Sequence, residues 1–576
     1  MKKQPMKVTR RRFLASVAVA PLVSAVKIPD LGGGKLSDLQ QRSPKPEVPV
    51  SDLPFHSFER ISMGLRGVVC TSNPLASDAA MWALKDGGNA FDAALAAAAV
   101  LTVVEPQSSH LGGDVFLVAY VAKENKVYAL NGSGRAPREI DISVFAGGIP
   151  ERGPLAATIP GAVHGWCEVS RRWGKLPLKR VLQPAIEYAR DGFPISVRLA
   201  RSISTLASII SMSPYARQQF LSIDPKPGNI LRQPALARTL EAIADQGVDG
   251  FYQGEIAKEM VRGIREQGGV FSEDDLREHD TIVVAPISTS YRGVKVLEQP
   301  PVSQGHILLE ELNIVENFDL KSMGILSADT LHVLIEAKKL AFADKARYLG
   351  DPEFSKIPVE ELVSKEWGRR RAEEINLSRA NPQPEFGHLG RSNTDTTYLA
   401  VADSEGNAVS WIQSIFFVFG SGVVAGNTGV LLNNRMNGFT IQSGHPNTLE
   451  PGKRPVHTLN AYILMKDDKP WIVGGTPGGD YQVQTNLQVI SNLVDFDLNI
   501  AEANDAPWWA SLEGNNIRVE NRVRQDILAE LEKKGHRIDV IGAWAGDRIV
   551  QLVQFGSNGA LLGASDLRGE GYAAAW

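Results

Sequence analysis

The chain has 576 residues, enough for one large domain or several ordinary ones. Its 61 Lys and Arg residues nearly balance 65 Asp and Glu residues, giving a net charge of −4. That balance gives no electrostatic sign of nucleic-acid binding or of attachment to an anionic membrane. The two cysteines, Cys70 and Cys167, lie in no metal-binding or redox motif. We predict two separate buried thiols, with a disulfide between them as the alternative.

The N-terminus has the pattern of an export signal. Thr9–Ala15 read TRRRFLA, an apolar stretch runs from Phe13 to Val26, and Val23-Ser24-Ala25 has the form of a cleavage site. The stretch is shorter than the roughly 20 apolar residues that span a bilayer. We therefore predict a twin-arginine signal peptide at residues 1–25 and a periplasmic or secreted protein. A basic tail before a short core helix is the alternative.

Gly, Pro and Ser are frequent in residues 26–54, which predicts a linker. Two helices rich in small residues follow. Ser77 is a plausible N-cap for a helix that runs to about Lys85, and Gly87-Gly88-Asn89 would end it. The Ala-rich run Asp92–Val104 predicts a second helix that packs closely against its neighbours.

Apolar residues alternate in Phe116–Ala122 and Lys126–Leu130, which predicts a β-hairpin. Helical periodicity then appears in three stretches, Lys179–Ala189, Leu236–Ala244 and Ala328–Tyr348. After residue 393 the pattern predicts strands at Thr397–Ala402, Ala408–Ile412, Gly429–Leu432, Ala461–Met465 and Trp471–Val473, a helix at Gln482–Val494 and a strand pair between Arg548 and Leu562. Periodicity alone therefore predicts a mixed α and β chain.

Four segments together resemble the γ-glutamyltranspeptidase family. They are DGGNAFDAALAAAAVLTVVEP (86–106), PPVSQGHILLEELNIVENF (300–318), NTDTTYLAVADSEGNAVS with GSGVVAGNTGVLLNNRMNGF (393–410 and 420–439), and GGTPGGDYQVQTNLQVI (474–490). The resemblance implies an α+β fold, the four-layer αββα sandwich of N-terminal nucleophile hydrolases, with no cofactor and no metal ion. It also implies self-cleavage into a large subunit (55–395) and a small subunit (396–576) that form one intertwined domain.

The resemblance places the cut between Asp395 and Thr396 and makes Thr396 the nucleophile. The Thr396 hydroxyl would attack the Asp395 carbonyl, and water would open the resulting ester. The freed α-amino group, with an ordinary pKa of about 8, would then act as base for the same hydroxyl. Taken without the family pattern, Thr396 and Thr397 read as ordinary strand residues, because threonine favours strands.

Three further residues match catalytic positions of the family. Gly478 and Gly479 fall at the oxyanion hole, where each backbone N–H contributes about 3 kcal/mol to binding a tetrahedral oxygen. Ser414 falls at a hydroxyl that assists processing. A plain turn that needs glycine is the alternative for the two glycines.

The predicted substrate pocket departs from the family. Ser133 stands where the family has an arginine for the substrate α-carboxylate. Arg135, two residues later, would share its strand face and is either a substitute or a surface arginine. Phe416 replaces an asparagine, and Arg435 and Gly438 replace the residues that hold the substrate amino end.

The physical consequence is a changed charge preference. Arg435 would repel a glutamyl ammonium and attract a carboxylate in forked geometry. His457 and Thr458 replace a serine pair, and His457 either binds substrate or supports a residue that does. The stretch 439–455 is shorter than its counterpart in the family, which predicts a more open pocket.

We therefore expect a self-processing amidohydrolase or acyltransferase of γ-glutamyltranspeptidase type, acting on γ-glutamyl compounds such as glutathione. An acylase or amidohydrolase for a non-glutamyl amide, like cephalosporin acylase or oxamate amidohydrolase, is the alternative. A non-catalytic exported binding protein is the hypothesis from a different class. The expected partners are a small-molecule amide, water or an amine acceptor, and the two subunits of one precursor. A homodimer of heterodimers stays open, and neither nucleic acid nor a membrane span is expected.

Overall fold

The computed structural model describes residues 53–382, 384 and 396–576. The predicted signal peptide, most of the predicted linker and the predicted cleavage residue Asp395 lie outside the described residues. The fold concerns the unit Pro54–Trp576. Within the described ranges, every helix is too short or too polar to cross a bilayer.

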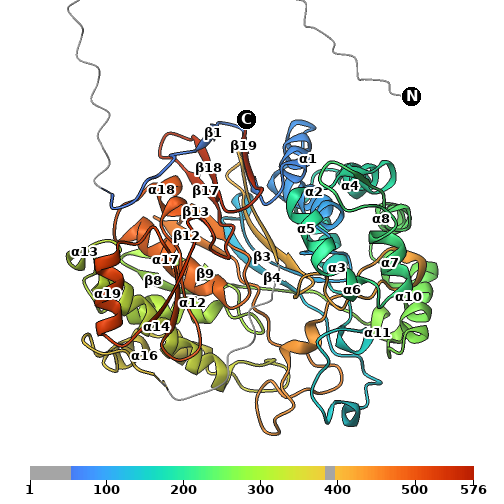
Figure 1. Cartoon of the computed structure of the whole chain (residues 1–576). Helices are drawn as coiled ribbons and strands as arrows, with labels where there is room; N and C mark the ends of the chain where they lie inside the picture. The colour runs from blue at the N-terminus through green and yellow to red at the C-terminus, as the bar shows by residue number, and fades with distance from the viewer. Residues whose placement is uncertain (1–52, 383, 385–395) are drawn as a thin grey trace, which may run out of the picture. The chain divides into compact units, whose positions relative to one another are not determined.

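Two antiparallel sheets of seven strands each lie at the centre (Figure 1). In spatial order, the first contains β1 (Ser62–Gly64), β18 (Leu561–Ser565), β17 (Gln551–Phe555), β13 (Lys469–Gly475), β12 (Tyr462–Lys466), β9 (Val294–Glu298) and β8 (Ile287–Tyr291). The second contains β19 (Tyr572–Ala575), β2 (Gly67–Thr71), β10 (Thr397–Asp403), β11 (Ala408–Ser414), β3 (Asp114–Val121), β4 (Lys126–Gly132) and β7 (Ile282–Val284). Each sheet thus combines strands from before and after Thr396.

The inner faces of the two sheets form a continuous apolar core. Val68 and Ile412 of the second sheet belong to the same buried cluster as Ile463, Val473 and Val553 of the first. Cys70 lies in this core and Cys167 in a helix outside it. Both thiols are buried and unbridged, which confirms the prediction from the sequence.

Helices cover both outer faces. Against the second sheet lie α1 (Pro74–Lys85), α2 (Ala90–Val104) and α3 (Ala162–Trp173), with α4 (Leu178–Asp191) packed on α2 and α8 (Pro234–Gln246) on α4. Against the first lie α12 (Gly305–Val315) and α17 (Tyr481–Val494), with α14 (Ala328–Tyr348) packed on α12. All residues of α2 are buried, which small side chains allow on every side of a helix. The result is the expected αββα sandwich.

Shorter elements complete the described chain. The remaining helices are α5 (Val197–Thr205), α6 (Ala207–Ile210), α7 (Pro214–Phe220), α9 (Asp249–Tyr252), α10 (Gly254–Glu266), α11 (Glu273–Arg277), α13 (Leu320–Met323), α15 (Val359–Leu362), α16 (Lys365–Ala372), α18 (Ile500–Asp505) and α19 (Gln525–Lys533). Two small sheets contain β14 (Trp509–Ser511), β15 (Asn516–Glu520) and β16 (Arg537–Ile541), and β5 (Phe193–Pro194) and β6 (Ile230–Leu231).

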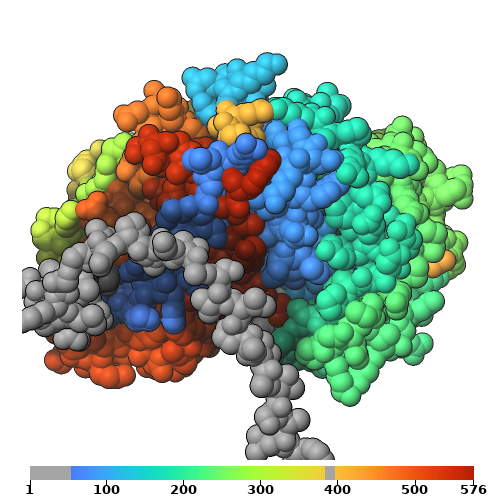
Figure 2. Space-filling model, turned by 90° about the horizontal axis from the view of Figure 1, so that it is seen from above, coloured from blue at the N-terminus to red at the C-terminus, as the bar shows by residue number. Residues whose placement is uncertain are grey.

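The end of the chain lies among its earliest described residues. Figure 2 shows the red C-terminal segment flanked on both sides by blue N-terminal segments. β19 pairs with β2, and the N–H of Arg66 donates to the Trp576 carbonyl at 2.7 Å. The C-terminal strand therefore closes one edge of the second sheet.

Two local predictions were wrong. Ser77 is inside α1, and the N-cap is Asn73, whose side chain accepts from the N–H of Leu75 while Pro74 opens the helix. The stretch Gly429–Leu432 forms only isolated bridges, because Gly429 takes a left-handed turn at φ 75°. The other predicted helices and strands are present, with ends shifted by a few residues.

Candidate active site

Thr396 lies directly before β10, beside the end of β11. In the antiparallel register Thr397 faces Gln413, so Thr396 comes next to Ser414. The Thr396 hydroxyl donates to Ser414 Oγ at 3.2 Å, and both residues are buried. The structure thus brings together the predicted nucleophile and the predicted processing residue.

Thr397 has a different environment. Its hydroxyl lies 2.7 Å from Ser72 Oγ and 3.2 Å from Glu105 Oε2, and Ser72 also donates to Glu105. This buried network occupies the Thr397 hydroxyl within the sheet, which favours Thr396 as the reactive residue. Our sequence interpretation missed Ser72 and Glu105. A carboxylate directly after the apolar helix Asp92–Val104 was the available signal for Glu105.

Gly478 and Gly479 form a loop between β13 and α17, which we call the oxyanion loop (Pro477–Asp480). Their φ angles of 126° and 56° are in the region that favours glycine. Their carbonyls accept from the N–H groups of Tyr481 and Gln482 at 2.9 and 3.1 Å. Among the described residues, neither glycine N–H donates a hydrogen bond. Two available N–H groups at the start of a 14-residue helix suit the binding of an oxyanion.

The strand that leads into the oxyanion loop is tied to the nucleophile strand across the core. The Tyr398 hydroxyl lies 2.6 Å from Ser410 Oγ, and Ser410 donates to the Gly474 carbonyl at 3.2 Å. A Cβ on Gly475 would lie only 2.4 Å from Cε2 of the Tyr398 ring, so glycine is required for this close approach. The two sheets are therefore held in a fixed relation where Thr396 and the loop begin.

Arg435 lies on the other side of Ser414. Asp114 faces Ser414 in the β3–β11 register, and Arg435 Nε lies 3.3 Å from Asp114 Oδ2. The guanidinium carbon is 4.2 Å from the centroid of the Phe416 ring, and the N–H of Phe416 donates to Ser414 Oγ at 2.7 Å. Arg435 and Asp114 are both 0% exposed. Neither terminal nitrogen of Arg435 has a hydrogen-bond partner among the described residues.

The Arg435–Asp114 pair is thus a buried ion pair of limited quality. Burial raises the pKa of Asp114 to about 6, although Arg435 and the N–H of Gly134 favour its carboxylate. Burial also lowers the pKa of Arg435 to about 10, so the guanidinium stays charged at neutral pH. The two terminal nitrogens of this buried cation still have hydrogen bonds to donate, and a second carboxylate could accept them.

His457 and Thr458 lie beside this pair. The His457 ring centroid is 5.0 Å from that of Phe116, and no atom of the ring is hydrogen-bonded to a described residue. Burial, with the charges of Arg435 and Arg454, lowers the pKa of His457 well below its ordinary value, so the ring is neutral. The Thr458 hydroxyl is likewise buried without a partner in the described part of the chain.

Arg135 is placed elsewhere. Its guanidinium binds Glu353 at 2.9 Å, Asp280 at 3.4 Å and the Gly452 carbonyl at 3.1 Å. Arg454 shares the same two acids. These contacts occupy the Arg135 side chain in an ion-pair network and do not connect it with Thr396.

A cavity of about 890 Å³ opens beside the oxyanion loop. Gly478 and Tyr481 form part of its wall, α5 with the segments 544–549 and 568–570 forms most of the remainder, and Arg152 and Val418 also line it. The cavity offers room next to the predicted oxyanion hole, on a side with several arginines.

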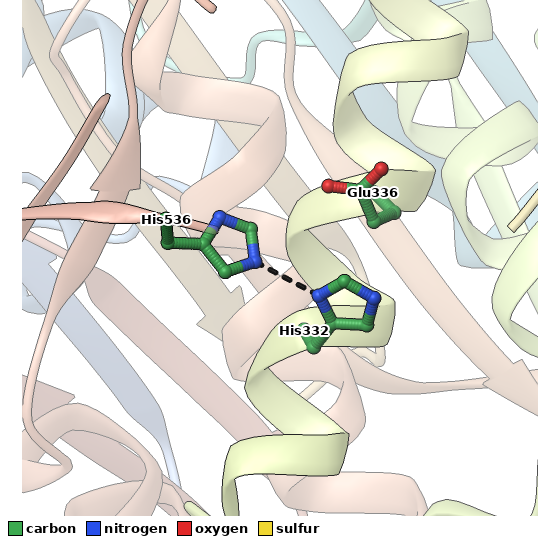
Figure 3. A group of neighbouring side chains, drawn as sticks. All are labelled: His332, Glu336 and His536. Atoms are coloured by element: carbon green, nitrogen blue, oxygen red, sulfur yellow. Dashed lines mark hydrogen bonds between the residues drawn. The ribbon is translucent and has the colours of Figure 1, made fainter. Parts of the chain in front are cut away.

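One group outside this region has the residue types of a metal site. His332 and Glu336, one turn apart on α14, and His536 place possible ligand atoms within 4.8 Å of one another. In Figure 3 one nitrogen of each ring points at the other ring, and His332 Nδ1 lies 2.8 Å from His536 Nε2. Lys339 Nζ lies 2.6 Å from Glu336, so an ammonium already neutralises the only carboxylate of the group. An added divalent cation would lie beside that ammonium, which disfavours a metal site.

Two central sheets between outer helices, with a threonine opening an inner strand, define the N-terminal nucleophile hydrolase fold. A sequence model of the family Gamma-glutamyltranspeptidase matches residues 76–576. The chain therefore belongs to the γ-glutamyltranspeptidase family and is an enzyme of that hydrolase type.

Named relatives agree with this assignment. The chain is 38% identical over 524 residues to the glutathione hydrolase-like YwrD proenzyme of Bacillus subtilis (strain 168), covering 89% of this chain and 98% of the relative. It is 35% identical over 586 residues to the glutathione hydrolase proenzyme of Escherichia coli (strain K12), covering 96% and 98%. The crystal structure of cephalosporin acylase from Bacillus halodurans superposes with a TM-score of 0.85 at 37% identity, covering 91% and 98%.

Proposed function

We propose that the chain is a proenzyme that cuts itself before Thr396 and then hydrolyses amides whose acyl group ends in a carboxylate. The observation that carries the proposal is Arg435, fully buried near the nucleophile with both terminal nitrogens unused. A substrate carboxylate would supply the forked partner that Asp114 does not.

The chemistry follows from the positions of the residues. In processing, the Thr396 hydroxyl attacks the Asp395 carbonyl and the C–N bond between the two residues breaks, which leaves an ester on Thr396 Oγ and frees the Thr396 amine. Water then hydrolyses the ester to the Asp395 carboxylate and restores the hydroxyl. In hydrolysis, that amine takes the proton of the Thr396 hydroxyl as it attacks the amide carbonyl. The N–H groups of Gly478 and Gly479 would bind the oxyanion. The substrate C–N bond then breaks, the amine leaves with the proton from the Thr396 amine, and water hydrolyses the acyl ester to a carboxylate and the free hydroxyl.

Arg435 also argues against an α-ammonium on the acyl group. An ammonium near Arg435 would be repelled at low dielectric, and the acid beside Arg435, Asp114, is already paired with it. A glutaryl group, which is a glutamyl group without its ammonium, should therefore be preferred. The named glutathione hydrolases among the relatives favour the second candidate, a γ-glutamyl substrate.

Self-cleavage is tested with the wild-type chain and Thr396→Ala on a denaturing gel. The wild type should give two fragments, the smaller beginning at Thr396, and the variant should stay intact. Thr397→Ala is the matched control and should still be cut if it folds. A wild type that remains whole when folded, or a fragment that begins at Thr397, would overturn the assignment.

The acyl group is tested by comparing glutaryl-p-nitroanilide with γ-glutamyl-p-nitroanilide. We expect kcat/KM at least about tenfold higher for the glutaryl compound, since about 1.4 kcal/mol of ammonium repulsion is enough for that ratio. A preference for the γ-glutamyl compound would contradict a pocket that binds the acyl carboxylate and repels an α-ammonium, and it would favour glutathione hydrolysis.

A further inference from the structure

The oxyanion loop is held from behind by a residue on the other side of the predicted cut. Gln304 Nε2 donates to the carbonyl oxygens of Thr458 at 2.7 Å and of Gly479 at 3.1 Å. Gln304 is fully buried and is the residue that precedes α12. One side-chain amide therefore joins the two segments that carry Thr458 and the oxyanion glycines.

Lys345 of α14 orients this amide. Its ammonium donates to Gln304 Oε1 at 2.7 Å, which leaves only the NH₂ group to face the two carbonyls. The same ammonium forms an ion pair with Asp480, the residue after Gly479. Lys345 thus holds the loop twice, once through Gln304 and once directly.

The backbone near Gln304 follows the Thr458 segment closely. The N–H of Gln304 donates to the His457 carbonyl at 3.0 Å, and the N–H of His457 donates to the Val302 carbonyl at 2.9 Å. Ser303 Oγ donates to the Leu459 carbonyl at 2.6 Å. The turn before α12 is therefore fixed to the Thr458 segment by these bonds, which include a single parallel bridge between Ser303 and His457, and it presents the Gln304 amide from a defined position.

The loop needs such support for a physical reason. Gly478 and Gly479 both have left-handed backbone, and glycine has many other conformations available. An N–H stabilises a developing oxyanion only if it is aimed before the reaction begins. The N–H of Gly479 belongs to the same peptide as the Gly478 carbonyl, which accepts from Tyr481, and the Gly479 carbonyl in the next peptide accepts from both Gln482 and Gln304. These bonds fix the peptide planes on both sides of Gly479.

We propose that Gln304 and Lys345 are positioning residues for the oxyanion loop. They do not touch the reacting atoms, and they act by fixing the backbone of the loop from which the N–H groups of Gly478 and Gly479 project. The inference rests on the proposed function of Thr396 and extends it. After the cut, two residues of the large subunit would set the geometry of a loop in the small subunit.

The test compares processed wild-type enzyme with Gln304→Leu, Lys345→Met and Lys345→Arg on glutaryl-p-nitroanilide. We expect kcat to fall about 10- to 100-fold for Gln304→Leu and Lys345→Met with KM within about twofold, because removing one oxyanion donor outright costs about 100- to 1,000-fold. Lys345→Arg, which can still donate to Gln304 and pair with Asp480, should recover most of kcat.

Gln267→Leu is the matched control. Gln267 Nε2 also donates to two backbone carbonyls, those of Gly263 at 2.7 Å and Val424 at 3.0 Å, at the end of α10. This variant should leave kcat unchanged. Equal losses in Gln267→Leu and Gln304→Leu, or a raised KM with unchanged kcat, would overturn the positioning role. If Gln304→Leu does not fold, the Lys345→Met and Lys345→Arg pair decides the question in the same way.

A second measurement separates this inference from the acyl-group proposal. Phenylmethylsulfonyl fluoride carries no carboxylate, and its attack by Thr396 also develops charge on oxygen. The rate of labelling at Thr396 should fall at least about tenfold in Gln304→Leu. If wild type is labelled but does not turn over the glutaryl compound, the acyl proposal fails while the Gln304 inference is still tested. Equal labelling of wild type and Gln304→Leu would reject the inference alone.

Discussion

Arg435 and Arg568 are both buried arginines in the part of the chain after Thr396, yet their surroundings differ. Arg568 Nε binds Glu520 at 2.6 Å, and its terminal nitrogens bind Asp566, Glu520 and the carbonyls of Asn504 and Ala506. Among the described residues, Arg435 has one polar contact, from Nε to Asp114 at 3.3 Å, beside its stacking on the Phe416 ring. The described part of the protein supplies hydrogen-bond partners for the whole guanidinium of Arg568, and it supplies only one for the guanidinium of Arg435.

The titration behaviour follows this difference. Burial opposes the charge of Arg568, but the carboxylates of Asp566 and Glu520 outweigh burial and raise its pKa. For Arg435, burial outweighs the single carboxylate and lowers the pKa to about 10. A completed charge network stabilises the fold, whereas an incomplete one leaves interaction energy for a ligand. We therefore expect Arg568 to stabilise the fold and Arg435 to determine which acyl group is bound.

The largest expected effect is on stability, in Arg568→Met. Glu520 and Asp566 would lose their shared cation while still buried, although Arg522 stays paired with Glu520 and Arg548 with Asp566. We therefore expect the free energy of unfolding to fall by about 3 kcal/mol, the low end for breaking a buried pair. Urea-induced unfolding of the processed protein measures this. The ratio of kcat/KM between glutaryl- and butyryl-p-nitroanilide should stay the same.

Arg522→Met is the control for this prediction. Arg522 pairs with Glu520 but not with Asp566, and the two nitrogens that bind Glu520 compete with Arg568. We expect a smaller loss of stability than for Arg568→Met. An Arg568→Met protein as stable as wild type would show that the network does not stabilise the fold.

The next effect is on specificity, in Arg435→Gln. We expect kcat/KM for glutaryl-p-nitroanilide to fall about 100-fold, or about 2.7 kcal/mol, because a charged forked contact is lost. Turnover of butyryl-p-nitroanilide should change little. Stability should fall less than in Arg568→Met, because Asp114 alone loses a partner and its raised pKa lets it take up a proton.

Arg180→Gln, which removes an exposed pair with Asp86, is the control and should change neither turnover nor acyl preference. If Arg435→Gln lowers turnover of both anilides equally, Arg435 supports the structure of the site and does not bind the acyl carboxylate.

The smallest effect is on pH dependence. Burial raises the pKa of Asp114 to about 6, so its carboxylate takes up a proton as pH falls from 8 to 5. Arg435 then loses its counter-charge while a substrate carboxylate, with an ordinary pKa of about 4.3, stays ionised. The ratio of kcat/KM for the glutaryl over the butyryl anilide should therefore rise severalfold as pH falls through 6.

The ratio cancels titration of the Thr396 amine, because that group serves both substrates. In Asp114→Asn the ratio should be high and independent of pH. A ratio that falls with falling pH in the wild type would contradict the assigned pair.

The sequence by itself determined the local structure and, through its family motifs, predicted Thr396 as the nucleophile. The hairpin of β3 and β4, helix α14 and strands β10 and β11 were predicted because their apolar spacing is a local property of neighbouring residues. Thr396, Ser414 and the two glycines came from the family motifs, and the structure places Thr396 against Ser414. The Ser77 cap failed because Asn73 with Pro74 made a better helix start four residues earlier.

Only the tertiary structure decided which charges are satisfied and which residues hold the loop. Arg435 and Asp114 are 321 residues apart, and Gln304 and Gly479 are 175 apart. Arg135 and Arg435 looked equally available in the sequence, yet only the partners brought in by the fold occupy one and leave the other incomplete. Hydrogen bonding and burial depend on neighbours in space, and the spacing along a chain does not specify those neighbours.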